Sequence, residues 1–252
     1  MKQIVSVIKK WELFVLLLTG LTACNKETDV TKAVSIEIKG FNIGNAELQI
    51  SVDTLVYRNF QVAPNQELNF GKVFTYPSST NEVALKIKDL TSGKELYTQQ
   101  LKLNNPDMER FFQFVLIDGN QLELQAPAAD PATNKIGFYI HYPQSSDPID
   151  IIMKNTEGQM VYLAQNVQPS TWVYSDYLTQ AGFENPNTNY TLNFTKAGTT
   201  DAWAFNDNEY MSQSSEDAMF LPQQGQKGRV CSYFVTPGTV DLRVVRLFQP
   251  QK

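Results

Sequence analysis

The sequence has little of the side-chain chemistry on which metalloproteins and many enzymes depend. It contains one histidine and two cysteines in 252 residues, and none of these lies at a metal-ligand spacing from another. The histidine, His141, alternates with Ile140 and Tyr142, so it should point away from the apolar face of its strand. A serine-type triad would need this histidine, and no Gly-x-Ser-x-Gly motif is present. We therefore predict no enzyme activity, no catalytic residues, no metal and no cofactor.

Positive charge and long apolar runs are also scarce. Lys and Arg total 21 against 26 Asp and Glu, which gives a net charge of −5. A basic footprint for nucleic acid is therefore absent. No stretch approaches 18 consecutive apolar residues, so we expect no membrane-spanning helix.

Thiols and carboxylates give no further site. Cys231 has only Cys24 as a partner in the chain, so we expect no internal disulfide and a buried, inert thiol. The acidic residues between positions 201 and 217 lack the spacing of a calcium loop. A pair of carboxylates for glycoside hydrolysis would leave no sequence signature, and a glycoside hydrolase stays open as a weaker alternative.

The N-terminus carries the clearest signal in the chain. Three lysines precede a short apolar run at residues 13–21, which is the pattern of a secretory signal. The sequence Leu21-Thr22-Ala23-Cys24 then resembles the lipobox of bacterial lipoproteins. That resemblance implies a signal peptide over residues 1–23 and a lipid on Cys24. Each buried CH₂ of such a lipid contributes about 0.8 kcal/mol, so two or three acyl chains would hold the protein on a membrane.

The residues after the cysteine bear on location. Lys26-Glu27 resembles the lysine-plus-acidic export signal of Bacteroidota surface lipoproteins, although Thr28 interrupts the acidic pair. The resemblance implies a lipid-anchored outer-membrane protein that faces the cell surface. A charged tether that faces the periplasm remains the alternative.

Apolar and polar residues alternate with a period of two along most of the remaining chain, as in strands with one buried face. Residues 111–117 are apolar on both faces, as in a central strand. Turns rich in Gly, Asn and Asp separate these segments. The alternation is clearest at Val34, Ile36, Ile38, Leu48, Ile50, Val52, Val83, Leu85, Ile87, Ile136, Phe138, Ile140 and Tyr142.

A linker divides the strand-rich region in two. Residues 125–134 are small, rich in proline and poor in large apolar side chains. The sequence therefore predicts an all-β chain of two tandem immunoglobulin-like or prealbumin-like antiparallel β-sandwiches. The expected order is a lipidated tether over 24–33, a first sandwich over 34–124, the linker over 125–134 and a second sandwich over 135–252.

Two further patterns concern the sandwiches. Residues 83–97 and 149–162 share a strand, a lysine, an Asx residue, a glycine turn and an aliphatic-Tyr strand, which either duplication or ordinary hairpin chemistry explains. Asp147-Pro148-Ile149-Asp150-Ile151 followed by Ala164-Gln165-Asn166-Val167 resembles a family of bacterial extracytoplasmic sandwich domains of unknown function. The whole chain also resembles the two-sandwich surface lipoproteins of Bacteroidota. Neither resemblance implies a catalytic residue.

Aromatic residues supply the candidate binding site. Trp203, Phe205 and Tyr210 lie in residues 201–228, the longest stretch without clear alternation, among carboxylates and amides. Aromatic rings beside polar groups suit a polar ligand such as a glycan. The alternative places Trp203 in a core. Trp172 and Tyr174 share one strand face, which favours a core position for them too.

These patterns predict a non-catalytic cell-envelope lipoprotein that binds a glycan or a partner protein at the outer membrane. The alternative function is that of a structural accessory subunit in an outer-membrane assembly.

Overall fold

The computed structural model describes residues 30–104, 108–124, 126–184, 190–215 and 219–247. Strands dominate these ranges, and their one helix is the short α2, Glu209–Ser212. No helix within them is long and apolar enough to cross a membrane. The predicted signal peptide and Cys24 lie outside the described residues.

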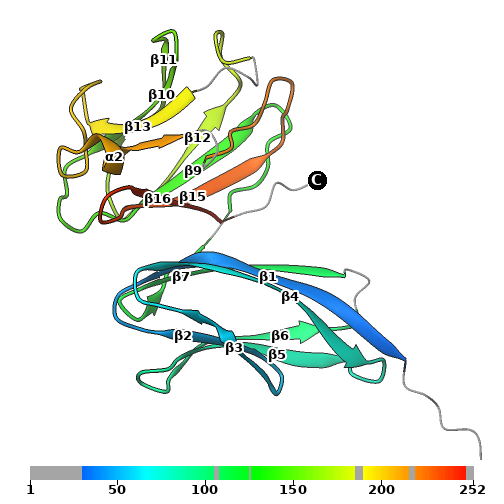
Figure 1. The fold of residues 1–252 in the computed structure, drawn as a ribbon. Helices are drawn as coiled ribbons and strands as arrows, with labels where there is room; N and C mark the ends of the chain where they lie inside the picture. Colours follow the sequence, from blue (N-terminus) through cyan, green and yellow to red (C-terminus); the bar gives the residue numbers. More distant parts are fainter. Residues whose placement is uncertain (1–29, 105–107, 125, 185–189, 216–218, 248–252) are drawn as a thin grey trace, which may run out of the picture.

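The first sandwich consists of two four-stranded sheets that enclose one apolar core (Figure 1). Sheet A has the order β4-β1-β7-β8 and sheet B the order β3-β2-β5-β6. The predicted alternation is confirmed, because Val34, Ile36 and Ile38 all lie in the core. The strands are β1 Thr31–Ile43, β2 Leu48–Val52, β3 Leu55–Val62, β4 Gln66–Pro77, β5 Glu82–Asp89, β6 Glu95–Lys102, β7 Glu109–Ile117 and β8 Asn120–Gln121.

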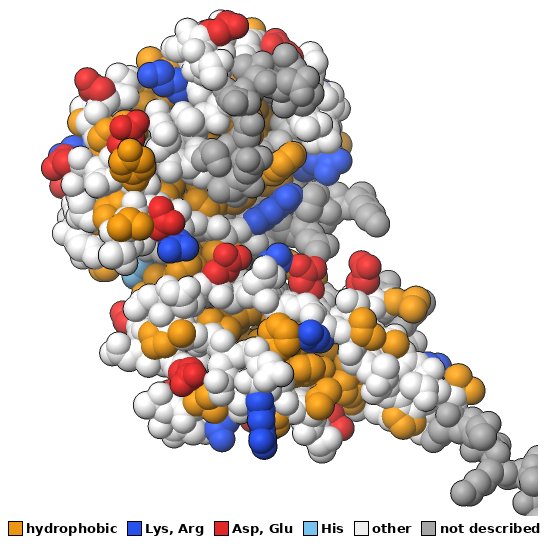
Figure 2. Space-filling view, in the orientation of Figure 1, with side chains coloured by type: hydrophobic (Ala, Val, Ile, Leu, Met, Phe, Trp, Pro, Cys, Tyr) orange, Lys and Arg blue, Asp and Glu red, His pale blue; other side chains and the backbone are white. Residues whose placement is uncertain are grey.

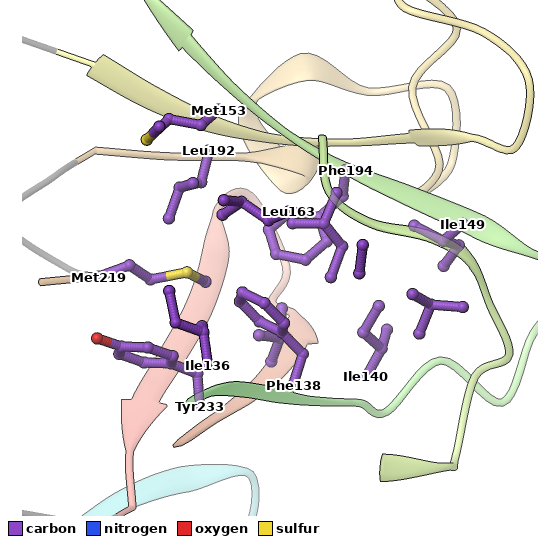
Figure 3. Close-up of a cluster of buried hydrophobic side chains, with 14 of the residues drawn as sticks. Ile136, Phe138, Ile140, Ile149, Met153, Leu163, Leu192, Phe194, Met219 and Tyr233 are labelled. Carbon is purple, nitrogen blue, oxygen red and sulfur yellow. The ribbon is translucent and has the colours of Figure 1, made fainter. Parts of the chain in front are cut away.

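The second sandwich is built in the same way. Sheet C has the order β12-β9-β15-β16 and sheet D the order β11-β10-β13-β14. Its core holds the predicted row Ile136, Phe138 and Ile140 (Figure 3). Tyr142, the last residue of that row, belongs to the same core. The strands are β9 Asn134–Ile140, β10 Ile149–Asn155, β11 Met160–Val167, β12 Trp172–Tyr177, β13 Tyr190–Lys196, β14 Gln213–Ser215, β15 Val230–Pro237 and β16 Leu242–Arg246.

The two sandwiches repeat a single topology, strand for strand, from β1–β8 to β9–β16. An immunoglobulin domain keeps its first two strands in one sheet, whereas here the first and second strands of each sandwich lie in different sheets. The strand order is that of the prealbumin-like alternative. The repeat predicted between residues 83–97 and 149–162 is out of register, because it equates the hairpin β5–β6 with β10–β11. The topological equivalent of β10–β11 is β2–β3, so hairpin chemistry explains the sequence similarity.

Each sandwich contains one parallel pair within its otherwise antiparallel sheets. β1 runs parallel to β7, and β9 runs parallel to β15. The strand that enters each sandwich therefore lies in the middle of its sheet, next to a strand from near the end of the same sandwich.

A third apolar cluster joins the two sandwiches, and we call it the seam. The outer faces of sheets A and C meet there, so the four sheets stack as layers in the order B, A, C, D (Figure 1). Phe234 of β15 is fully buried in it and lies 5.7 Å from Phe41 and 5.9 Å from Tyr139, between ring centroids. The buried members are Phe41, Val115, Tyr139, Phe234, Val245 and Leu247.

The Asp-x-aliphatic motif of the predicted family resemblance has a structural role. The Asp150 carboxylate is buried and accepts hydrogen bonds from the backbone N–H groups of Asn166 and Gly198, each at 2.8 Å. Asn166 has φ +54°, and the pairing of β10 with β11 is irregular near Ile149 and Ile151. Asp150 thus pins the end of β11 and the β13 turn to one point, because a buried carboxylate needs such partners.

Candidate functional site

The segment predicted to bind a ligand begins as an extension of sheet D. The N–H of Lys196 donates to the carbonyl of Ala202 at 2.8 Å, and Trp203 forms a bridge with Thr195. Phe205 is fully buried, with its ring 5.0 Å from Tyr142 between centroids. The expectation that Phe205 contacts a ligand is therefore wrong, because its ring fills the core between the sheets.

The other two predicted residues are more exposed than Phe205. Trp203 is half-buried. Tyr210 lies on α2 and is 76% exposed. Asn208 caps this short helix by accepting a hydrogen bond from the Met211 N–H at 3.2 Å. Ligand binding by Trp203 and Tyr210 stays a prediction.

A different set of rings forms the best-built candidate site. Tyr139, Trp172 and Tyr174, which we call the aromatic shelf, lie on the outer face of sheet C. Tyr139 is the buried member that belongs to the seam as well, and Trp172 packs against the seam. Trp172 is opposite Tyr139 in the β12–β9 pair, which puts both rings on the same face. The ring of Trp172 stacks on Tyr174 at 5.6 Å and 17° and lies 5.4 Å from Tyr139.

Local sequence explains how the shelf is held. Tyr174 is opposite Gly137, where an added Cβ would come within 2.1 Å of the Tyr174 ring. Glycine at this position therefore lets the ring lie down on the sheet. The Tyr174 hydroxyl accepts a hydrogen bond from Ser232 Oγ at 3.4 Å, and Trp172 Nε1 donates to the carbonyl of Glu123 at 3.3 Å. Burial raises the pKa of Tyr174, so its hydroxyl stays protonated at neutral pH.

The shelf borders an open cavity of about 540 Å³. Its opposite wall is the segment that follows β8, which supplies Leu122, Glu123 and Pro127, and Ser170 completes the rim. Glu123 is the single ionisable carboxylate among the lining residues. The size lies in the range of small-ligand sites, and the site combines flat apolar rings with a few polar groups. The cavity lining is Leu122, Glu123, Ala126, Pro127, Tyr139, Ser170, Trp172 and Tyr174.

We expected Trp172 and Tyr174 to lie in a core. The register of β12 with β9 corrects this expectation. Both are half-buried and point away from the core of the second sandwich, whereas Val173 between them packs against that core. The sequence signal for this site would be an alternation that shows whether Val173, or Trp172 and Tyr174, face the core. The sequence leaves this open, because Trp172-Val173-Tyr174 is apolar on both faces.

The described residues offer little material for other chemistry. They contain no group of three or more His, Cys, Asp or Glu side chains that could hold a metal ion. The Cys231 thiol is buried, and burial raises its pKa. The thiol is therefore a poor nucleophile at neutral pH.

No protein-family model and no curated protein matches the sequence. A candidate cell adhesion protein from Bacteroides uniformis is similar at 10% identity and a TM-score of 0.31, over 87% of this chain and 97% of that one. A family 41 carbohydrate-binding module from streptococcal virulence factors, with α-glucan recognition, is similar at 9% identity and a TM-score of 0.26, over 83% and 95%. A family 26 carbohydrate-binding module from Eubacterium rectale, in complex with maltoheptaose, gives 14% identity and a TM-score of 0.20, over 84% and 96%.

Proposed function

We propose that this protein is a non-catalytic binding protein of the cell envelope that takes a glycan on the aromatic shelf. The observation that carries the proposal is the stacked pair Trp172 and Tyr174, half-buried on the outer face of sheet C beside a cavity of about 540 Å³. A pyranose ring presents an apolar C–H face, and flat aromatic rings are the side chains that bury such a face best.

The shelf's surroundings suit an uncharged sugar. Its rings are fixed by Gly137, by the Ser232 hydroxyl and by the Glu123 carbonyl, so little side-chain freedom is lost on binding. Ser170 and Glu123 are among the lining residues, and their hydroxyl and carboxylate groups can hydrogen-bond sugar hydroxyls. The ligand would thus meet apolar rings below and polar groups at its edges.

The envelope location rests on the N-terminal sequence. The order of lysines, apolar run and Leu21-Thr22-Ala23-Cys24 supports a lipid on Cys24 as the membrane anchor. Lys26-Glu27 supports an outer-membrane protein exposed at the cell surface. The anchor would leave both sandwiches outside the bilayer and their cavities open to external glycans.

A structural accessory subunit of an outer-membrane assembly is the second candidate function, and the seam favours it. An apolar cluster that fixes two sandwiches against each other makes a stiff spacer. A partner protein rather than a glycan would then occupy the exposed faces.

A glycan array with the wild type and two variants tests the proposal. Trp172→Leu keeps an apolar side chain but removes the flat ring, and it should weaken binding to any array-positive glycan at least tenfold, which is about 1.4 kcal/mol. Tyr162→Leu is the matched control, because Tyr162 is an exposed aromatic of β11 outside both the shelf and the segment predicted to bind a ligand. Equal loss in both variants, or loss in Tyr162→Leu alone, would contradict the assignment, and an array without any positive glycan would favour the accessory subunit.

A further inference from the structure

A second cavity opens at the other side of the seam, and we call it the cleft. Its volume is about 400 Å³, and both sandwiches line it. The first sandwich supplies residues of β1 and of the β3–β4 turn, and the second supplies residues after β9 and from the β15–β16 hairpin. The lining is Phe41, Ile43, Asn65, Gln66, His141, Pro143, Gln144, Thr236, Pro237, Gly238, Thr239 and Arg243.

Two polar side chains in the cleft are buried and lack hydrogen-bond partners within the described part of the chain. His141 is 8% exposed and stacks on Phe234 at 6.3 Å, but its ring nitrogens make no hydrogen bond there. Thr236 is 6% exposed, and its hydroxyl is likewise unpaired. The polar side-chain atoms of both residues keep some access to solvent. We therefore take them to face the cleft. Buried polar groups are normally satisfied, which points to a partner that enters the cleft.

Charged side chains of both signs lie around the cleft. Arg243 forms an ion pair with Asp241, with Nε and Oδ1 3.1 Å apart. Burial raises the pKa of the Glu67 carboxyl, and the nearby Lys39 and Arg243 lower it by a smaller amount. Burial lowers the pKa of His141 and outweighs the opposite effect of the nearby Asp118 carboxylate, so the imidazole is mainly neutral at pH 7. An uncharged ligand with many hydroxyl groups therefore fits the cleft better than an anion or a cation.

We propose that the cleft is a second sugar-binding site, which takes an uncharged sugar unit through His141 and Thr236. The inference rests on the proposed glycan-binding function and adds a site that only the assembled pair of sandwiches can form. The amides of Gln66 and Gln144 offer further donors and acceptors, and Phe41 offers an apolar wall. A glycan that contacts the cleft would also favour the observed arrangement of the sandwiches, since both contribute to the site.

The experiment uses the one histidine and the three tryptophans of the chain as reporters. Purified protein with labelled histidine and tryptophan is titrated with maltoheptaose, cellohexaose, xylohexaose and mannohexaose and followed by NMR. A single imidazole signal reports the cleft without assignment, and Trp→Phe variants assign the indole signals of Trp172 and Trp203. Tri-galacturonate serves as the charged comparison.

We expect at least one uncharged glycan to shift the His141 signal, with Thr236→Val weakening that response roughly three- to tenfold, as for one lost hydrogen bond. Thr236→Val should leave the Trp172 response unchanged. A shift of Trp172 without His141 would overturn the cleft site and keep the shelf, whereas a shift of His141 alone would keep the cleft and reject the shelf. The cleft assignment is overturned as well if only the charged sugar shifts His141, or if none of the five does.

Discussion

Phe234 is the residue on which the contact between the two sandwiches depends most. Its ring is fully buried in the seam and contacts Phe41 of the first sandwich and Tyr139 and His141 of its own sandwich, at centroid distances of 5.7, 5.9 and 6.3 Å. It points away from the core of the second sandwich, into which its neighbour Tyr233 points. Phe234→Ala therefore removes the seam's central ring and leaves the sandwich core intact.

The expected cost follows from complete burial of the ring. Replacing a buried Phe by Ala lowers the free energy of unfolding by about 3–5 kcal/mol. For a chain of this size each kcal/mol lowers the melting temperature by about 2–4 °C, so calorimetry should show a fall of roughly 6–20 °C. Small-angle X-ray scattering should show a larger radius of gyration, because the sandwiches lose their main mutual contact.

Phe138→Ala is the matched control. Phe138 is also fully buried, but it lies in the core of the second sandwich, 6.0 Å from Tyr233 and 6.5 Å from Phe194 (Figure 3). It should lower the melting temperature by a similar amount without changing the radius of gyration of the folded protein. A Phe234→Ala variant that melts like the wild type, or that scatters like Phe138→Ala, would refute the role given to the seam.

Four further predictions concern other parts of the chain. Asp150→Ala removes the acceptor of two part-buried hydrogen bonds, from the backbone N–H groups of Asn166 and Gly198. It should lower the free energy of unfolding by about 1–3 kcal/mol, measured by urea titration; an unchanged midpoint would argue against the role given to Asp150. Burial lowers the pKa of His141 below its usual 6.5, so the free energy of unfolding should fall as the pH drops below about 6.5. His141→Asn should flatten the dependence of the melting temperature on pH between pH 7.5 and 5. Parallel curves for the variant and the wild type would show that other groups cause the pH dependence. Cys24→Ala should release the protein from membranes or leave an uncleaved precursor, and sedimentation of a processed mutant with membranes would reject the anchor. Limited proteolysis should cut first within residues 125–134, and a first cut inside 111–117 would oppose two separable units.

Residues near the middle of the sheets could be predicted from the sequence, because their pattern is local. Val34, Ile36 and Ile38 alternate with polar residues, and burial of one strand face alone explains that period. The parallel pairing of β1 with β7 has no such local signal, since the two strands are far apart in the chain. Hairpins reuse the same turn residues, which is why the apparent repeat equated strands that are not equivalent.

The candidate site was harder to predict because it depends on pairing between distant strands. The sequence shows that Trp172 and Tyr174 share a strand face. Only their pairing with Tyr139 and Gly137 shows that this is the outer face of sheet C. Phe205 showed the opposite difficulty. A polar neighbourhood in the sequence suggested an exposed ring, although the chain turns there and buries it against Tyr142.

The space-filling view shows apolar and charged side chains mixed over the visible face of both sandwiches (Figure 2). The composition of this face therefore does not single out a binding site on it, and the position of a bound glycan must be observed directly. The most direct measurement is a crystal structure of the protein with an array-positive glycan. A pyranose ring should lie flat over Trp172 and Tyr174, within van der Waals contact of both rings. A glycan bound against Tyr210 and α2, with the aromatic shelf empty, would contradict the proposed function.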